Sequence, residues 1–300
     1  MPKAGTLVEK VEIRLDTSLA RELSKLNGPE EMRQIRDIAK RVRIFRITYW
    51  SNGYKVKGFM AEPRHLKAKL PCIIWNRGGS GEFGAIKIGP AFRKLGTMAD
   101  WGYVVIASQY SGNGGSEGKE DWGRAKTMAD VLNLKFILDK TPHADTKRIG
   151  MYGASRGGVM TYRALTMVKW IKAAVTVAGS TDARRMVKYR PDMAKIYKLY
   201  GVTKKDLTLI SAVDWPEKFC KKTPLLLIHG TADWRVPYLD ALDLSRKLFE
   251  NKVPHRLTSF EGADHSISEY SNERNHLIRA WFDRYVRDGA KLPNLKLHGG

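Results

Sequence analysis

The chain has few cysteines and no long apolar segment. Cys72 and Cys220 are the only cysteines among 300 residues, which argues against a disulfide framework or a cysteine-bound metal and favours two buried thiols in a reducing compartment. No stretch approaches the ~18 apolar residues that a membrane-spanning helix needs, and the first residues lack the basic and apolar regions of a secretory leader. These absences favour a cytoplasmic protein with no membrane partner.

Acidic residues are also scarce. Asp and Glu number 31 against 53 Lys and Arg, which gives a formal net charge of +22. Such a charge attracts nucleic acids or acidic surfaces without specificity at low salt. The basic residues form short, dispersed clusters interleaved with apolar positions and carry no known nucleic-acid-binding signature. We therefore predict a solvated basic surface and no specific nucleic-acid partner, with binding of acidic partners as a distant alternative role.

Apolar, β-rich runs recur along the chain and are separated mostly by helical patterns. Six of them are expected to be buried strands, at residues 71–76, 103–108, 147–152, 173–178, 224–229 and 255–260. Two earlier runs, 43–50 and 54–61, flank Asn52 and Gly53, a strong signal for an antiparallel hairpin. The pattern predicts an α/β fold with a mostly parallel eight-stranded sheet and helices on both faces.

Two segments fall outside this alternation. Residues 1–42 contain apolar positions at helical spacing, interrupted at Asn27, Gly28 and Pro29, and are predicted to form a short helical appendage to a domain over 43–300. About forty residues, 180–222, separate two of the strands and are rich in Tyr, Lys and Arg. This length exceeds a simple crossover, so we expect a small helical cap insertion here.

A Gly-x-Ser-x-Gly motif, Gly153-Ala154-Ser155-Arg156-Gly157, lies where a predicted strand runs into a helical stretch. In that context the motif is typical of a nucleophile elbow, a sharp turn that lifts the serine hydroxyl clear of the sheet. The turn brings backbone segments so close together that only glycine fits two residues either side of the serine. Ser155 is therefore the candidate nucleophile, against the alternative of a serine in a simple tight turn.

Partners for the serine follow in the order that α/β-hydrolases use, serine, acid, histidine. Asp233 comes directly after the strand at 224–229, and His265 lies in a glycine-containing loop after the last strand. Asp233 has an alternative role as a capping residue for the helix expected near Val236, and Asp264 is a rival acid. We favour Asp233 because open α/β sheets build their sites at the carboxyl ends of strands.

The same stretches resemble a known family. Residues 153–158, 109–118, 229–237 and 261–265 are similar to the catalytic domain of the prolyl oligopeptidase family, in particular its esterase-like members that have no propeller, over about residues 45–289. The resemblance implies an α/β-hydrolase fold and acyl transfer through Ser155, with Asp233 and His265 as its partners. Tyr110 and Trp234 lie in the two long motifs and are expected to contact substrate.

An oxyanion hole needs two preorganised donors. The backbone N–H of Arg156 is expected to supply one. The loop after the third strand, 76–84, is expected to supply the other; relatives often carry His-Gly-Gly or Tyr-Gly-Gly there, and here the matching position is Arg77. The second donor is therefore left open between the backbone N–H of Arg77 or Gly78 and the Arg77 guanidinium.

Two glycine loops suggest nucleotide sites, but neither motif is complete. Residues 79–84 satisfy Gly-x-Gly-x-x-Gly, yet Gln109 and Tyr110 stand where a dinucleotide site places an acidic residue. The loop at 112–119 has Asn113 where a phosphate loop needs glycine. We predict a cofactor-free, metal-free serine hydrolase acting on a small ester or a short peptide. About seventy residues before the third strand are too few for a propeller, so ester hydrolysis is favoured over peptidase activity; the oligomeric state is not predicted.

Overall fold

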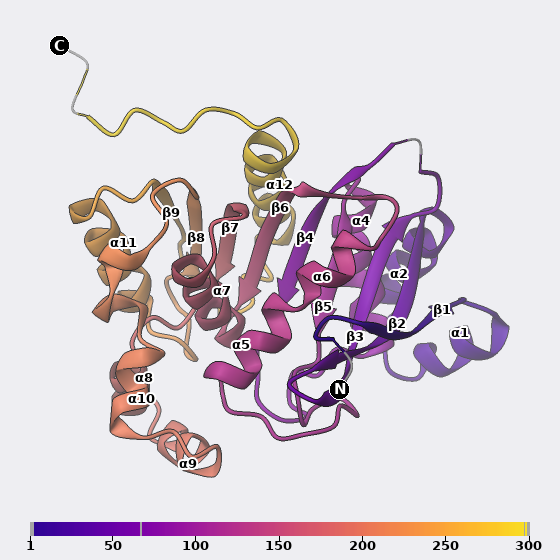
Figure 1. Cartoon of the computed structure of the whole chain (residues 1–300), viewed down its shortest axis with the longest axis horizontal. Helices are drawn as coiled ribbons and strands as arrows, with labels where there is room; N and C mark the ends of the chain where they lie inside the picture. Colours follow the sequence, from indigo (N-terminus) through magenta and orange to yellow (C-terminus); the bar gives the residue numbers. More distant parts are fainter. Residues whose placement is uncertain (1–2, 67, 297, 299–300) are drawn as a thin grey trace. The chain divides into compact units, whose positions relative to one another are not determined.

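The computed structural model describes residues 3–66, 68–296 and 298 (Figure 1). The chain forms two compact units, which we treat separately. The first contains the described residues up to Glu120 together with Ala129–Lys147. The second contains Asp121–Met128 and the described residues from Arg148 onward.

The first unit is built on a mixed sheet. Its strands are β1 (Leu7–Ile13), β2 (Val42–Ser51), β3 (Tyr54–Pro63), β4 (Leu70–Asn76) and β5 (Val104–Ser108). They lie in the order β1-β2-β3-β5-β4, with antiparallel pairing except between β4 and β5, which are parallel. Strand β5 is entirely buried, as its apolar sequence predicts.

The predicted hairpin between β2 and β3 is confirmed. Ser51 pairs with Tyr54, so the connection has two residues, and Asn52 and Gly53 have φ angles of 51° and 80°. Positive φ at both positions is what a twisted two-residue hairpin requires, and Asn-Gly adopts it at little cost. Turn chemistry therefore sets the register of the longest strand pair in this unit.

The first forty residues differ in part from the prediction. Helices α1 (Thr17–Ser24) and α2 (Pro29–Arg41) are separated at the predicted break, but they are preceded by strand β1, which pairs with β2. The segment is therefore not purely helical, and the described residues contain nine strands where eight were expected. The remaining helical elements associated with this unit are α3 (Ile88–Pro90), a π-helix (Ala91–Gly96), α4 (Thr97–Asp100), α6 (Leu134–Asp139) and the last part of α5 (Ala125–Leu132).

The second unit contains four parallel strands. They are β6 (Ala144–Ala154, of which the part from Arg148 belongs here), β7 (Ile171–Val177), β8 (Leu225–Gly230) and β9 (His255–Phe260), paired in that order. Because parallel strands end at one edge of a sheet, residues that follow β6, β8 and β9 are brought to the same edge.

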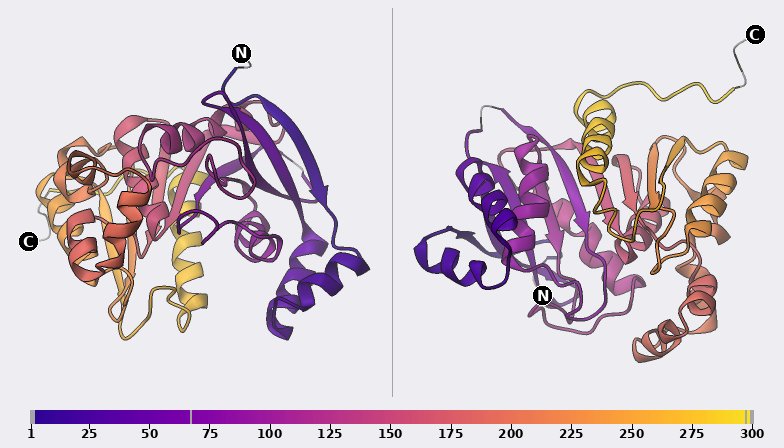
Figure 2. Two further views of the ribbon diagram at one scale, coloured as in Figure 1. Left: turned by 90° about the horizontal axis from the view of Figure 1, so that it is seen from below. Right: turned by 180° about the vertical axis from the view of Figure 1, so that it is seen from behind.

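Helices cover both faces of these strands (Figure 2). Gly150 and Gly153 point to opposite faces because they are three residues apart on β6. A side chain at Gly150 would meet Phe282 of α12 (Ser271–Phe282), and one at Gly153 would meet Thr161 of α7 (Arg156–Met167). Helix α11 (Tyr238–Glu250) connects β8 to β9. The α/β class predicted from the sequence is thus confirmed.

The chain between β7 and β8 holds three short helices, α8 (Ala183–Tyr189), α9 (Asp192–Leu199) and α10 (Lys204–Leu209), followed by two single 3₁₀ turns. We call residues 182–210 the α8–α10 segment. Asp182 caps α8 by accepting hydrogen bonds from the N–H groups of Arg184 and Arg185. Thr203 and Asp206 form a capping box on α10. Local capping thus supports helices that are too short to be stable alone.

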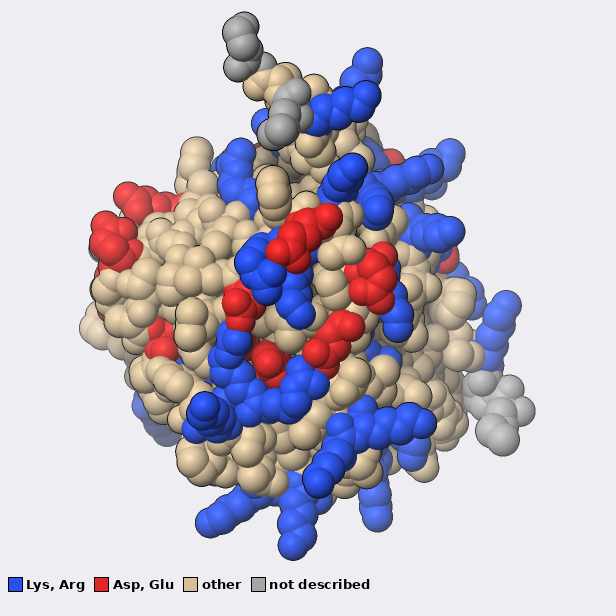
Figure 3. Space-filling view, turned by 90° about the vertical axis from the view of Figure 1, so that its left-hand side faces the viewer, with Lys and Arg blue, Asp and Glu red and all other residues tan. Residues whose placement is uncertain are grey.

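Surface and thiol properties complete the picture. Figure 3 shows Lys and Arg side chains spread around a smaller group of acidic ones on one face. No helix within the described ranges has the length and apolar character needed to cross a membrane. Both cysteines are free thiols: Cys72 is buried as expected, whereas Cys220 is partly exposed.

Candidate active site

Ser155 lies on a sharp turn between β6 and α7. Its φ and ψ are 55° and −122°, a conformation that non-glycine residues seldom adopt. The turn is held because Ser155 N–H donates to Val177 O of β7 at 2.8 Å and Ser155 O accepts from Gly158 N–H at 2.9 Å. The strand-turn-helix context predicted for the Gly-x-Ser-x-Gly motif is present.

The glycine two residues before Ser155 is required by contact, as the sequence suggested, and so is Gly158. A Cβ at Gly153 would lie 2.1 Å from Gly157 O, far inside van der Waals contact. A Cβ at Gly158 would lie 2.7 Å from Gly179 Cα, because the start of α7 packs against the chain that leaves β7. The close packing holds the backbone of the turn in its strained conformation.

His265 and Asp233 are in direct contact. His265 Nδ1 lies 2.8 Å from Asp233 Oδ2, and since a carboxylate only accepts, the proton is on Nδ1. The Asp233 side chain is fully buried, whereas the His265 side chain is 15% exposed. The arrangement leaves Nε2 of His265 as the unprotonated nitrogen of a neutral ring.

Asp233 also organises its own loop. Its Oδ1 accepts hydrogen bonds from the backbone N–H groups of Arg235 at 2.8 Å and Val236 at 3.0 Å. The alternative capping role is therefore partly realised, although α11 begins only at Tyr238. Burial alone would raise the pKa of Asp233, but hydrogen bonds from His229 and His265 outweigh it and lower the pKa below its ordinary value. The carboxylate is thus held in its charged form.

His229, which the sequence analysis did not place in the site, is a second histidine beside the same carboxylate. Its Nε2 is 3.1 Å from Asp233 Oδ2, and its side chain is 1% exposed. His229 is the last but one residue of β8, and Asp233 follows the same strand end. This closeness in sequence was the signal by which the pairing of His229 with Asp233 could have been predicted.

The α8–α10 segment contacts both sides of this cluster. The Tyr189 hydroxyl donates to the carbonyl of Asp233 at 3.2 Å. Tyr197 of α9 packs edge-on against Trp122, with ring centroids 4.8 Å apart. The guanidinium of Arg156 lies over the same Trp122 ring, 5.1 Å from its centroid. The segment therefore contacts the acid loop directly, and it is linked through Trp122 to Arg156, the residue next to Ser155.

Comparison with known proteins now adds to this geometry. Residues 91–289 match the model of the prolyl oligopeptidase family. The chain belongs to this family. Over 250 residues it is 29% identical to the uncharacterized peptidase YtmA of Bacillus subtilis, covering 81% of this chain and 94% of that protein. The protein is thus a serine hydrolase of the prolyl oligopeptidase family.

Solved structures of the α/β-hydrolase fold match this family member as well. An acylaminoacyl peptidase of Pyrococcus horikoshii has a TM-score of 0.71 at 20% identity, over 85% of this chain and 44% of that one. The esterase Pf2001 of Pyrococcus furiosus has a TM-score of 0.65 at 20% identity, over 84% of this chain and 93% of that one. The chain thus spans less than half of the acylaminoacyl peptidase and nearly all of the esterase, and it shares the fold of both.

Trp234, predicted to contact substrate, is well exposed for a tryptophan. The residue is 57% exposed to solvent. The guanidinium carbon of Arg235 lies 4.5 Å from its ring, and that of Arg190 lies 5.9 Å away. An exposed aromatic ring flanked by two cations directly follows Asp233.

Three other predicted site residues, Arg77, Gly78 and Tyr110, lie in the first unit. Tyr110 is fully buried and its hydroxyl donates to Arg77 O at 3.1 Å, so its ring does not present a surface to substrate. The Arg77 guanidinium donates to the carbonyls of Gln109, Gly78 and Gly81, so it supports its own loop. The backbone N–H groups of Arg77 and Gly78 stay a prediction.

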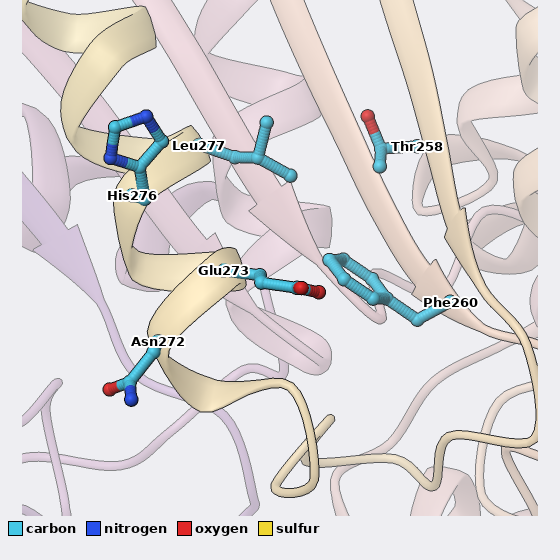
Figure 4. Close-up of a pocket in the computed structure, with 6 residues that line it drawn as sticks. All are labelled: Thr258, Phe260, Asn272, Glu273, His276 and Leu277. Carbon is cyan, nitrogen blue, oxygen red and sulfur yellow. The ribbon is translucent and has the colours of Figure 1, made fainter.

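A separate cavity of about 630 Å³ lies between β9 and α12 in the second unit. It is lined by Thr258, Phe260, Asn272, Glu273, His276 and Leu277 (Figure 4). Phe260, Glu273 and Leu277 point toward one another, whereas Asn272 and His276 are turned away. None of its residues belongs to the Ser155, Asp233 and His265 group. Within the described part of the chain, no group of three or more His, Cys, Asp or Glu side chains is arranged to hold a metal ion.

Proposed function

We propose that this family member hydrolyses carboxylic esters by two-step acyl transfer, with Ser155 as nucleophile, His265 as general base and Asp233 as the acid that orients it. The contact between His265 Nδ1 and Asp233 Oδ2, 2.8 Å long, carries the proposal. It sets the tautomer that a base needs, and it occurs at the strand edge to which the Ser155 turn also belongs.

The chemical steps follow from these positions. Ser155 Oγ attacks the ester carbonyl carbon while its proton passes to His265 Nε2, and the tetrahedral oxyanion accepts a hydrogen bond from the backbone N–H of Arg156. The carbon–oxygen bond to the leaving alcohol breaks as His265 returns the proton to that oxygen. Water then attacks the carbonyl carbon of the acyl-serine while its proton passes to His265 Nε2. The bond to Ser155 Oγ breaks as His265 returns the proton to Oγ, which releases the acid and free Ser155.

The α8–α10 segment is proposed to be the cap of this site. Its contacts through Tyr189 and Tyr197 support this role. Trp234 is proposed to contact the substrate from the acid loop, since its exposed ring is stiff and offers apolar area at small entropic cost. The cap and this ring together are expected to select the acyl group.

Ester cleavage is the less demanding reaction for such a group of residues, because an alcohol is a better leaving group than an amine and depends less on complete proton transfer from His265 as the bond breaks. Peptide hydrolysis is the second candidate. It is favoured by the name of the YtmA peptidase, a relative that the chain matches over 94% of its length. The two activities differ in the ratio of kcat/KM between matched ester and amide substrates.

Labelling with a fluorophosphonate tests the proposal. We expect the wild-type protein to take up one equivalent at Ser155, to turn over p-nitrophenyl esters of short acids, and to cleave the matched anilides more slowly; Ser155→Ala is expected to lose all three properties. Cys72→Ala, which changes a buried nucleophile on β4, is the control and should label normally. A wild-type protein that is not labelled when a reference serine hydrolase is would contradict the proposal. Association with acidic partners that is unchanged in Ser155→Ala would favour a binding role instead.

A further inference from the structure

His229 is buried, and among the described residues its Nε2 atom faces only hydrogen-bond acceptors. That nitrogen lies 3.1 Å from the carbonyl oxygen of Val236 and 3.1 Å from Asp233 Oδ2. Both neighbours are acceptors, so the Nε2 atom carries the proton of the neutral ring; this N–H makes a hydrogen bond to Val236 O and lies beside Asp233 Oδ2. Tyr238 of α11 packs edge-on against the imidazole, with centroids 5.9 Å apart. The orientation of the ring is therefore set from two sides.

The Asp233 carboxylate accordingly has N–H groups close to both of its oxygens. Oδ1 takes two backbone N–H groups, and Oδ2 is shared between His265 Nδ1 at 2.8 Å and His229 Nε2 at 3.1 Å. The His229 contact is distinct from the triad contact, because it comes from β8 and His265 comes from the loop after β9. Rotation of the carboxylate would break contacts on both oxygens at once.

We propose that His229 is a positioning residue of this site: its Nε2–H stabilises the charged carboxylate of Asp233 and keeps Oδ2 directed at His265. The inference rests on the proposed function of Ser155, Asp233 and His265. His229 does not touch the substrate or the reacting atoms in this proposal and acts only through Asp233.

The charge balance predicts how the site changes when this donor is removed. The titratable side chains that contact Asp233 are His229, at the end of β8, and His265, while the Tyr189 hydroxyl from α8 reaches its carbonyl and Tyr238 from α11 packs on His229. Two N–H donors spread the negative charge of one carboxylate oxygen. With one donor lost, more of the negative charge on Oδ2 faces His265, and protonated His265 is stabilised more strongly than the neutral ring.

Three substitutions separate these effects. His229→Phe keeps the ring shape and removes the donor, His229→Gln keeps an N–H near the Nε2 position, and His229→Asn is too short to reach Asp233. His255→Phe is the matched control, because this histidine lies at the opposite end of the parallel strands and contacts Ser245 and Val253. We expect His229→Phe and His229→Asn to lower kcat by about 10- to 100-fold, the loss that accompanies a missing hydrogen bond to a charged group, with KM changed less than about threefold.

The pH dependence distinguishes positioning from a merely structural role. The acidic limb of kcat/KM, and the His265 titration followed by NMR of ¹⁵N-histidine-labelled protein without substrate, should both move to higher pH in His229→Phe and His229→Asn. His229→Gln should restore most of kcat and the wild-type limb, and His255→Phe should change neither. If His229→Phe does not fold, the Asn and Gln pair gives the same comparison.

Two outcomes overturn the inference. One is a His229 variant that folds with wild-type kcat and an unmoved His265 titration; the other is a loss of kcat with an unmoved titration that Gln does not restore. Failure of the proposed function looks different, because the wild-type protein itself would then not react with the fluorophosphonate, while the NMR titration would still report the contact between the side chains.

Discussion

Replacing Asp233 with asparagine is expected to inactivate the site while leaving the loop in place. The two oxygens of the carboxylate have different partners: Oδ1 accepts two backbone N–H groups, and Oδ2 accepts from His265 and His229. An amide has one acceptor and one donor end. Because only the acceptor end satisfies the backbone pair, the NH₂ group of the substituted side chain would be turned toward two imidazole N–H groups.

The consequence for His265 can be worked out from this geometry. Its Nδ1 would have to accept from the amide, which places the ring proton on Nε2, the atom proposed to act as the base, so that atom can no longer accept the serine proton. Stabilisation of the imidazolium by a buried carboxylate is lost as well. The same exchange in a Ser-His-Asp protease lowers kcat by about 10⁴-fold, roughly 5.5 kcal/mol of the barrier, and we expect a loss of that order here.

The assay is kcat for a p-nitrophenyl ester between pH 5 and 9, with active-site titration to count competent protein and circular dichroism to check folding. Asp264→Asn is the matched control, because among the described residues this neighbouring carboxylate accepts a hydrogen bond only from the N–H of Ser266 in the same loop. It should stay within about threefold of wild-type activity. If Asp233→Asn folds and keeps more than a tenth of kcat, or if Asp264→Asn loses as much, Asp233 is not the acid of the site.

The remaining predictions concern stability. Gly153→Ala places a Cβ 2.1 Å from a backbone oxygen and is expected to cost about 3 kcal/mol of unfolding free energy; Gly28→Ala, with no atom within 4 Å of the new Cβ, should cost at most about 1 kcal/mol in urea titrations. Burial raises the pKa of Asp240 to about 6. Since the folded state then binds the proton more tightly than the unfolded chain, whose pKa is near 3.9, this group makes stability fall as pH rises from about 4 to 6, by about 3 kcal/mol. Between pH 4.5 and pH 7 the urea midpoint of the wild type should therefore fall relative to that of Asp240→Asn, which lacks the titrating carboxyl. An equal change of midpoint in the two proteins would refute the reasoning. The Tyr197 hydroxyl is buried and makes no hydrogen bond within the described chain, whereas the Tyr49 hydroxyl bonds to Ser108 and to Asp130 O; Tyr197→Phe should raise the thermal midpoint slightly and Tyr49→Phe lower it, and the reverse order would show that the first hydroxyl has a partner.

The parts of the site that the sequence predicted are those set by backbone spacing. A short turn between a strand and a helix has few solutions, and Gly153 is excluded from carrying a side chain by contact with Gly157 O. The ends of parallel strands meet at one edge, so Asp233 and His265 could be paired from chain order alone, although 32 residues separate them.

The parts that the sequence missed depend on where side chains and isolated strands find partners. Tyr110 was expected to contact substrate, and the Arg77 guanidinium was one of the candidates left open for the second oxyanion donor. The structure uses the polar groups of both side chains on loop carbonyls, because a buried loop must satisfy its own backbone acceptors. Strand β1 escaped prediction because most of its residues are exposed and its structure comes from pairing with β2. Edge strands carry a weak apolar pattern, so pairing decides them more than local preference does.

Asp233 shows why a capping interpretation and a catalytic interpretation of one residue need not compete. A carboxylate has two oxygens, and here the turn uses Oδ1 and the histidines use Oδ2. The backbone hydrogen bonds to Oδ1 fix the plane of the carboxylate. Oδ2 is therefore already oriented toward His265, and no further conformational entropy of the side chain is lost during the reaction. If this coupling holds, a substitution that disturbs the turn without touching the carboxylate should also reduce activity. Val236→Pro, which removes one of the two N–H donors to Oδ1, is therefore expected to lower kcat as well as stability, whereas a change in stability alone would show that the two oxygens act independently.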